Sequence, residues 1–178
     1  MAIVRGLFEG KRKLFWALAA GTLALDQASK LLLWHPPGEG RPPVILIPHV
    51  LRVISHGGNL RGALGLGPSG PLFYIVAALV GLTAVIVFFA ATDVHRGAVH
   101  WALGMLAGGA IGNLVDRLAL GYVRDFVDLH WGDTYHWHTF NAADAAICVG
   151  FVLIVYETFF VKEKPREDAG QGASRAAT

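Results

Sequence analysis

The sequence is poor in cysteine and in charged residues. Its 178 residues include one cysteine, Cys148, which excludes an internal disulfide and any zinc site built from cysteines. Charged residues make up 16% of the chain, whereas a soluble domain carries about 25%. The net charge of +2 gives no indication of a nucleic-acid partner. Hydrophobic residues account for 54%, so the composition predicts a membrane protein.

Nucleophilic and phosphate-binding motifs are also missing. The chain has four serines, and none lies in the Gly-x-Ser-x-Gly pattern of a serine hydrolase. It has no glycine-rich motif of the kinds that bind nucleotides. Carboxylates therefore remain as the groups best suited to catalysis.

Four stretches are long and apolar enough to cross a bilayer, which takes about 20 helical residues. They cover residues 14–34, 72–92, 97–115 and about 141–161. The first stretch follows basic residues as a cleavable signal peptide would, but its length favours an uncleaved anchor. In the third, Gly104, Gly108 and Gly112 recur every four residues, which lets a neighbouring helix approach closely. We therefore expect an α-helical membrane protein with one four-helix domain over residues 1–165 and a disordered cytoplasmic tail over 166–178.

The positions of lysine and arginine predict the orientation. Nine of them flank the side that carries both termini, and five lie in the other loops. The positive-inside rule then places both termini in the cytoplasm and the loops 35–70 and 117–140 outside. Within the first of these loops, two short β-branched runs at 44–47 and 50–54 predict strands of a small sheet at the membrane surface.

Ionisable residues inside apolar spans are costly and usually functional. Asp26 and Lys30 are four residues apart on one helical face, so they can pair with each other or contact a substrate. Asn113 shares a face with Asp116 and Arg117 at the end of the third span, a group that we interpret mainly as scaffolding.

Two further carboxylates lie at the same expected membrane depth. Asp125 occupies a short extended stretch, and Asp144 opens the last helix, where Asn141 is the expected N-cap. A helix N-terminus favours a carboxylate in any case. The convergence of the two acidic residues is what points to function.

Three histidines follow in the second outward loop, close to Asp128 and Asp133: His130, His136 and His138. Imidazole and carboxylate are zinc ligands, but the spacing matches no helical ligand pair. The interleaved Trp131, Tyr135 and Trp137 are more typical of an aromatic belt at the membrane interface. We therefore predict no metal here.

The polar residues fall in four blocks: DQASK at 26–30, GGAIGNLVDR at 108–117, VRDF at 123–126 and FNAAD at 140–144. In order and spacing these blocks resemble those of lipoprotein signal peptidase, also called signal peptidase II. The resemblance covers about residues 14–160. It implies a bacterial inner-membrane aspartic endopeptidase that removes the signal peptide from diacylglyceryl-modified prolipoproteins, cutting before the lipidated cysteine.

The same resemblance assigns roles to individual residues. Asp125 and Asp144 fall on the two catalytic positions, and the supporting positions are Asp26, Lys30, Asn113, Asp116, Arg117, Asn141 and Ala143. It also implies an active site facing the periplasm, contact with membrane lipids, inhibition by globomycin-like cyclic peptides, and no metal or cofactor. Two close carboxylates share one proton, so one can activate water while the other donates. The sequence leaves open which of them is the base.

Two positions depart from the family pattern. The family usually has Asn-x-Gly-Ala-Ala-Phe in the first outward loop, and here Asn59 is kept while Arg61 replaces the glycine. Asn59 is therefore still expected near the substrate. The residue before Asp125 is often valine and here is Arg124. Since neighbours in extended chain point to opposite faces, we expect Arg124 to reach toward lipid headgroups.

Two other functions compete with the peptidase. A transporter or proton channel would use the ionisable residues as relay groups, but it needs them throughout the membrane depth. A non-catalytic assembly factor would account for the glycine stripe and not for the paired Asn and Asp residues.

Overall fold

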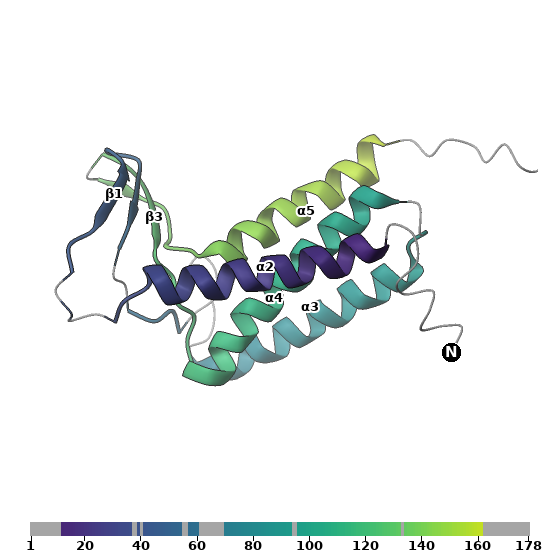
Figure 1. The fold of residues 1–178 in the computed structure, drawn as a ribbon, viewed down its shortest axis with the longest axis horizontal. Coiled ribbons are helices and arrows are strands. Elements are labelled where there is room, and N and C mark those ends of the chain that lie inside the picture. Colours follow the sequence, from purple (N-terminus) through teal and green to yellow (C-terminus); the bar gives the residue numbers. More distant parts are fainter. Residues whose placement is uncertain are drawn as a thin grey trace, which may run out of the picture.

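The computed structural model describes residues 12–36, 39, 41–54, 57–60, 70–93, 96–132 and 134–161. The predicted tail at 166–178 and Arg61 lie outside these residues. Four helices make up most of the described chain: α2 (Arg12–Leu33), α3 (Pro71–Ala91), α4 (Gly97–Leu120) and α5 (Ala142–Phe160). Figure 1 shows them running lengthwise beside one another, with a small sheet beyond one end.

Among the described helices, α3, α4 and α5 are long and apolar enough to cross a membrane. Helix α2 has 22 residues and would span about 33 Å, but Asp26, Gln27 and Lys30 lower its hydropathy. The chain is therefore an integral membrane protein by the character of its helices. The fourth span remains a prediction.

Helix α4 packs against each of the other three helices. A Cβ added at Gly104 would lie 2.6 Å from the carbonyl oxygen of Phe15, and one at Gly108 would meet the carbonyl of Ala19. At Gly112 it would collide with the carboxylate of Asp26. The glycine stripe therefore brings α2 directly onto α4. This confirms the predicted close approach and identifies α2 as the helix that makes it.

The sheet has four antiparallel strands in the order β1-β2-β3-β4. Its strands are β1 (Val44–Ile47), β2 (Leu51–Val53), β3 (Val127–Trp131) and β4 (Tyr135–His136). The two strands predicted in the first loop are confirmed. The sheet lies at the end of the molecule where α2 and α4 finish and α5 begins (Figure 1). Every predicted site residue is at this end.

Candidate active site

A fully buried ion cluster ties α2 to α4. The Lys30 ammonium lies 2.8 Å from the Asp26 carboxylate and 3.3 Å from the Asp116 carboxylate, and all three side chains are inaccessible to solvent. Asp26 also accepts a hydrogen bond from the backbone N–H of Ala143 at 3.0 Å. Asp26 and Lys30 thus pair with each other, one of the two roles that the sequence allows, as part of a larger cluster that also holds the start of α5.

Arg124 is the second cation of this cluster. Its Nη2 lies 2.7 Å from Asp116 Oδ1, and its backbone N–H donates to Asp116 Oδ2 at 2.9 Å. The side chain is 12% exposed. The expectation that Arg124 reaches lipid headgroups is therefore wrong, because a buried carboxylate eight residues earlier offers it an ionic partner. Sequence analysis also missed Gln27, whose amide oxygen accepts from Arg124 at 2.9 Å and whose amide nitrogen donates to Asp26 at 3.0 Å.

Asp125 is buried next to this cluster, in the segment that leads from α4 into β3. Its two carboxylate oxygens accept hydrogen bonds from the side chains of Asn141 at 2.7 Å and Asn59 at 2.8 Å. Asn59 is brought there because its backbone pairs with Val123. Burial raises the pKa of the Asp125 carboxyl to about 7, the charge of Asp144 adds to the rise, and the two asparagines oppose it.

Asp144 occupies the first turn of α5. Asn141 caps the helix by accepting from the Asp144 backbone at 3.0 Å, and the Asp144 carboxylate accepts in return from the Asn141 backbone at 3.3 Å. The capping arrangement expected from the sequence is thus confirmed. Asn113 on α4 donates to Asp144 Oδ1 at 2.8 Å, which fixes the carboxylate from the other side.

Asn113 links the ion cluster to both carboxylates. Its side-chain oxygen accepts from Lys30 at 3.0 Å and from Asn141 at 3.1 Å, while its amide nitrogen donates to Asp144. Asn141 in turn donates to Asp125. The buried cation therefore orients Asn113, which holds Asp144 directly and is linked through Asn141 to Asp125.

Arg117 does not pair with Asp116, although the two are adjacent. Its Nη1 donates to the carbonyl of Asn113 at 3.3 Å, and its guanidinium lies 5.2 Å from the centre of the Tyr74 ring. Helix α4 ends three residues later, at Leu120, where the capping Gly121 adopts φ 82° and its N–H donates to the Arg117 carbonyl. Arg117 thus fastens the end of α4 to the start of α3.

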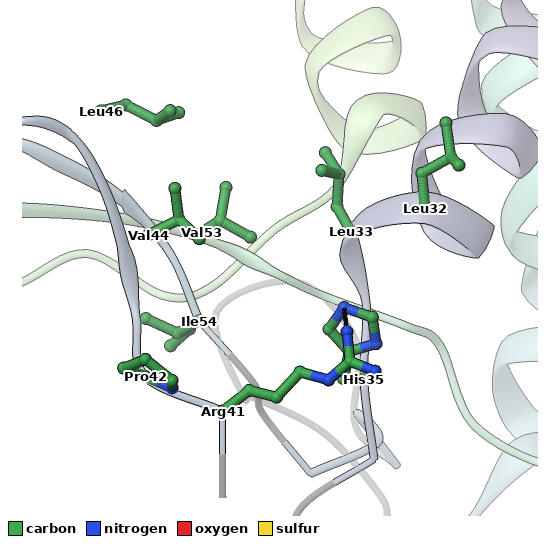
Figure 2. A pocket seen from close by; sticks show the side chains of 9 residues that line it. All are labelled: Leu32, Leu33, His35, Arg41, Pro42, Val44, Leu46, Val53 and Ile54. Atoms are coloured by element: carbon green, nitrogen blue, oxygen red, sulfur yellow. Dashed lines mark hydrogen bonds between the residues drawn. The ribbon is translucent and has the colours of Figure 1, made fainter. Parts of the chain in front are cut away.

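An apolar hollow of about 390 Å³ opens between the end of α2 and the first two strands. Figure 2 shows its aliphatic side chains on the end of α2 and on the two strands, with His35 and Arg41 at one edge. Arg41 Nη1 lies 3.1 Å from His35 Nε2. The hollow adjoins the segment of Asp125, since the N–H of Ile54 donates to the carbonyl of Phe126 at 2.9 Å. The lining residues are Leu32, Leu33, His35, Arg41, Pro42, Val44, Leu46, Val53 and Ile54.

Comparison with known proteins identifies relatives of this chain. The sequence model described as Signal peptidase (SPase) II matches residues 18–160. A lipoprotein signal peptidase of Rhizorhabdus wittichii is 38% identical over 85% of this chain and 89% of its own length. One from Geobacter sulfurreducens is 34% identical over 87% and 96%. A solved bacterial membrane enzyme at 2.3 Å resolution superposes with a TM-score of 0.68 and 28% identity, covering 83% of this chain and 91% of that one.

Proposed function

This chain belongs to the signal peptidase II family and is a peptidase, and from that premise we propose that it is an aspartic endopeptidase with Asp125 and Asp144 as its catalytic pair. Its substrates are bacterial prolipoproteins. We propose that these carry a diacylglyceryl group and that the cut falls before the lipidated cysteine. The observation that carries the assignment is that two carboxylates from different segments are each held by asparagine donors of one buried network.

Peptide hydrolysis needs the two carboxylates in different protonation states. A pair in a dry site shares one proton and titrates as a unit. With its pKa near 7, Asp125 suits the member that holds the proton and donates it to the scissile carbonyl oxygen. Asp144, at the N-terminus of α5, suits the ionised member that takes a proton from the attacking water. The asparagines hold both side chains in place during the transfer.

The direct test is cleavage of a lipidated precursor by the purified protein. A peptidase releases the signal peptide without nucleotide, metal or ion gradient, whereas a transporter or an assembly factor leaves the precursor intact. We also propose that globomycin-like cyclic peptides inhibit this cleavage, as expected from the family. Variants at Asp125 and Asp144 then locate the chemistry.

We propose that the protein lies in the bacterial inner membrane with four spans, both termini in the cytoplasm and the catalytic pair facing the periplasm. The bias in lysine and arginine supports this orientation. Reporter fusions after Lys164 should read cytoplasmic, and fusions near Gly67 should read external. The reverse pattern would place the carboxylates on the wrong side of the membrane for this reaction.

Cleavage should depend on the lipid of the precursor. Binding energy from a remote part of a substrate can position the scissile bond, so a precursor without the diacylglyceryl group should be cut much more slowly. The measurement compares kcat/KM for the two precursors under the same detergent conditions. Equal values would refute lipid recognition while leaving the peptidase assignment intact.

The apolar hollow supplies a matched pair of variants for this test. Val44 lines the hollow, whereas its neighbour Ile45 does not, because successive strand residues point to opposite faces. If the hollow receives apolar parts of the lipidated precursor, Val44→Asn should lower kcat/KM by up to about tenfold, or about 1.4 kcal/mol. Ile45→Asn, at a side chain of similar exposure, should leave it unchanged.

The pH dependence should follow the shared proton. Above about pH 7 Asp125 loses this proton, so kcat/KM should fall on the alkaline side. On the acid side it should fall when the second carboxylate takes up a proton. A profile measured between about pH 4 and 9 checks this, with thermal unfolding at each pH as the control for loss of fold. A rate that keeps rising to pH 9 would contradict a protonated Asp125.

A further inference from the structure

A second group of ionisable side chains lies on the sheet, separate from the catalytic pair. Asp128 and His130 are two residues apart on β3, so they project from the same face. His136 on β4 is the cross-strand partner of His130. One ligand atom from each residue can be chosen so that all three lie within 4.8 Å of one another. His138 is not in this group, and Asp133 lies outside the described residues.

The interior of this group has an unsatisfied nitrogen. The side chain of His130 is 6% exposed, and its Nδ1 has no hydrogen-bond partner among the described residues. Asp128 Oδ2 lies 3.9 Å from it, beyond hydrogen-bond distance. A buried polar atom left without a partner is destabilising, so such atoms are rare in folded proteins.

The other two ligands face the same point. His136 Nδ1 lies 3.2 Å from both oxygens of Asp128, and the two imidazole rings stack with their centres 5.4 Å apart. Two ring nitrogens thus converge on one carboxylate that is 3% exposed. Because the ligands come from two strands of a hairpin, they have no helical spacing, and sequence analysis set metal binding aside for that reason.

We propose that Asp128, His130 and His136 bind one divalent transition-metal ion of the zinc class, through a carboxylate oxygen and two Nδ1 atoms. Two imidazoles and a carboxylate form a common zinc donor set, whereas Ca²⁺ and Mg²⁺ require more oxygen ligands. Bonds of about 2.0–2.1 Å in a tetrahedron place ligand atoms about 3.3 Å apart. Asp128 and His136 already meet this separation, whereas His130 Nδ1, 3.9 Å from Asp128 Oδ2, has to move closer when the ion binds. A water molecule completes the fourth position.

Arg52 sets the orientation of the carboxylate. Its Nε lies 2.6 Å from Asp128 Oδ2, across the β2–β3 pair in which the two residues are in register. An outer partner of this kind fixes a metal-ligating carboxylate and leaves its other oxygen available. The positive charge of Arg52 opposes the incoming cation, so the site binds more weakly than one without it.

The ion would act as a structural clamp. Strand β4 contains two residues, Tyr135–His136, so its backbone pairing with β3 is limited. A metal bound by both strands fastens the hairpin, and Asp128 connects it through Arg52 to β2. The clamp is independent of the peptidase chemistry, and it can be tested without any substrate.

The experiment uses the full chain, purified in detergent without a polyhistidine tag, which would itself bind zinc. Titration calorimetry with Zn²⁺ should give one ion per chain, and Co²⁺ should give visible absorption bands of a four-coordinate site. His136→Gln removes a direct metal ligand. It should therefore weaken Zn²⁺ binding by at least about 10- to 100-fold, the loss typical when a residue that only hydrogen-bonds a ligand is removed. His136 is suited to this change because its side chain is 40% exposed, so the fold should tolerate it.

The matched control is His138→Gln, at an exposed histidine in the same segment but outside the group. Zn²⁺ should raise the unfolding temperature of the wild type and of His138→Gln, and should not raise that of His136→Gln. His130→Gln should behave like His136→Gln. Unchanged Zn²⁺ affinity in His136→Gln, or loss of binding in His138→Gln, would overturn the proposal, as would the absence of binding by the folded wild type.

Discussion

Asp125→Asn is expected to reduce cleavage of a lipidated precursor by at least about 10²–10⁴-fold, the usual contribution of general acid–base catalysis. Asparagine keeps the size of the side chain and can still accept one of the two hydrogen bonds from Asn59 and Asn141. It cannot exchange a proton. The protein should therefore remain inserted and folded and should still bind precursor, so that the defect appears in kcat.

Asp144→Asn should have the same effect, because we propose that the two carboxylates share one proton and act as a unit. The amide oxygen can still accept from Asn113 or from the backbone of Asn141, so the start of α5 should persist. The double variant should be scarcely slower than either single one, since the effects of residues that work together are not additive. If the fold reduction of kcat in the double variant equalled the product of the two single reductions, a shared proton would be contradicted.

Asp116→Asn is the control for this pair. Asp116 contacts Lys30 and Arg124, and the structure gives it no direct contact with either proposed catalytic carboxylate among the described residues. Its change should lower the unfolding temperature while the folded fraction keeps measurable turnover. If Asp116→Asn were well folded and inactive while Asp125→Asn turned over normally, the assignment would move to Asp116 and Asp144.

Contacts within one helix could be predicted from spacing alone. Asp26 and Lys30 are four apart, and Asn141 and Asp144 form a capping box, so helical geometry is enough to bring each pair together. The glycine stripe likewise predicted a close helix neighbour. It could not identify α2 as that neighbour, because a stripe of small residues describes only one of the two surfaces.

The particular partners of a side chain on another segment could not be predicted. Alternation along an extended chain predicts the side of the chain to which Arg124 points. It does not predict which residues of other segments lie on that side. The structure places Asp116 there, together with Gln27 from 97 residues earlier. The same holds for His130 and His136, whose proximity depends on the register of β3 and β4. From the sequence alone, Arg124 is therefore expected at the lipid surface, and the histidines in an aromatic belt.

The second large effect is expected at Lys30, which neutralises buried carboxylates. Lys30→Met keeps the length of the side chain but leaves Asp26 without its 2.8 Å ionic partner and Asp116 with Arg124 alone. Removal of one member of a buried ionic group costs about 3–5 kcal/mol, because the remaining charge stays desolvated. Thermal unfolding in detergent should show this loss. Lys13→Met, at an exposed lysine of the same helix, should change stability by less than about 0.5 kcal/mol.

A second substitution tests whether charge is the cause. Asp26→Asn combined with Lys30→Met removes one charge of each sign, and the asparagine oxygen can still accept from the backbone N–H of Ala143. Because the unpaired carboxylate is gone, the double variant should recover part of the stability lost in Lys30→Met, although it carries one more change. Such a favourable coupling is expected only for side chains that interact directly. A double variant less stable than Lys30→Met would show instead that the lysine acts through packing or through its hydrogen bond to Asn113.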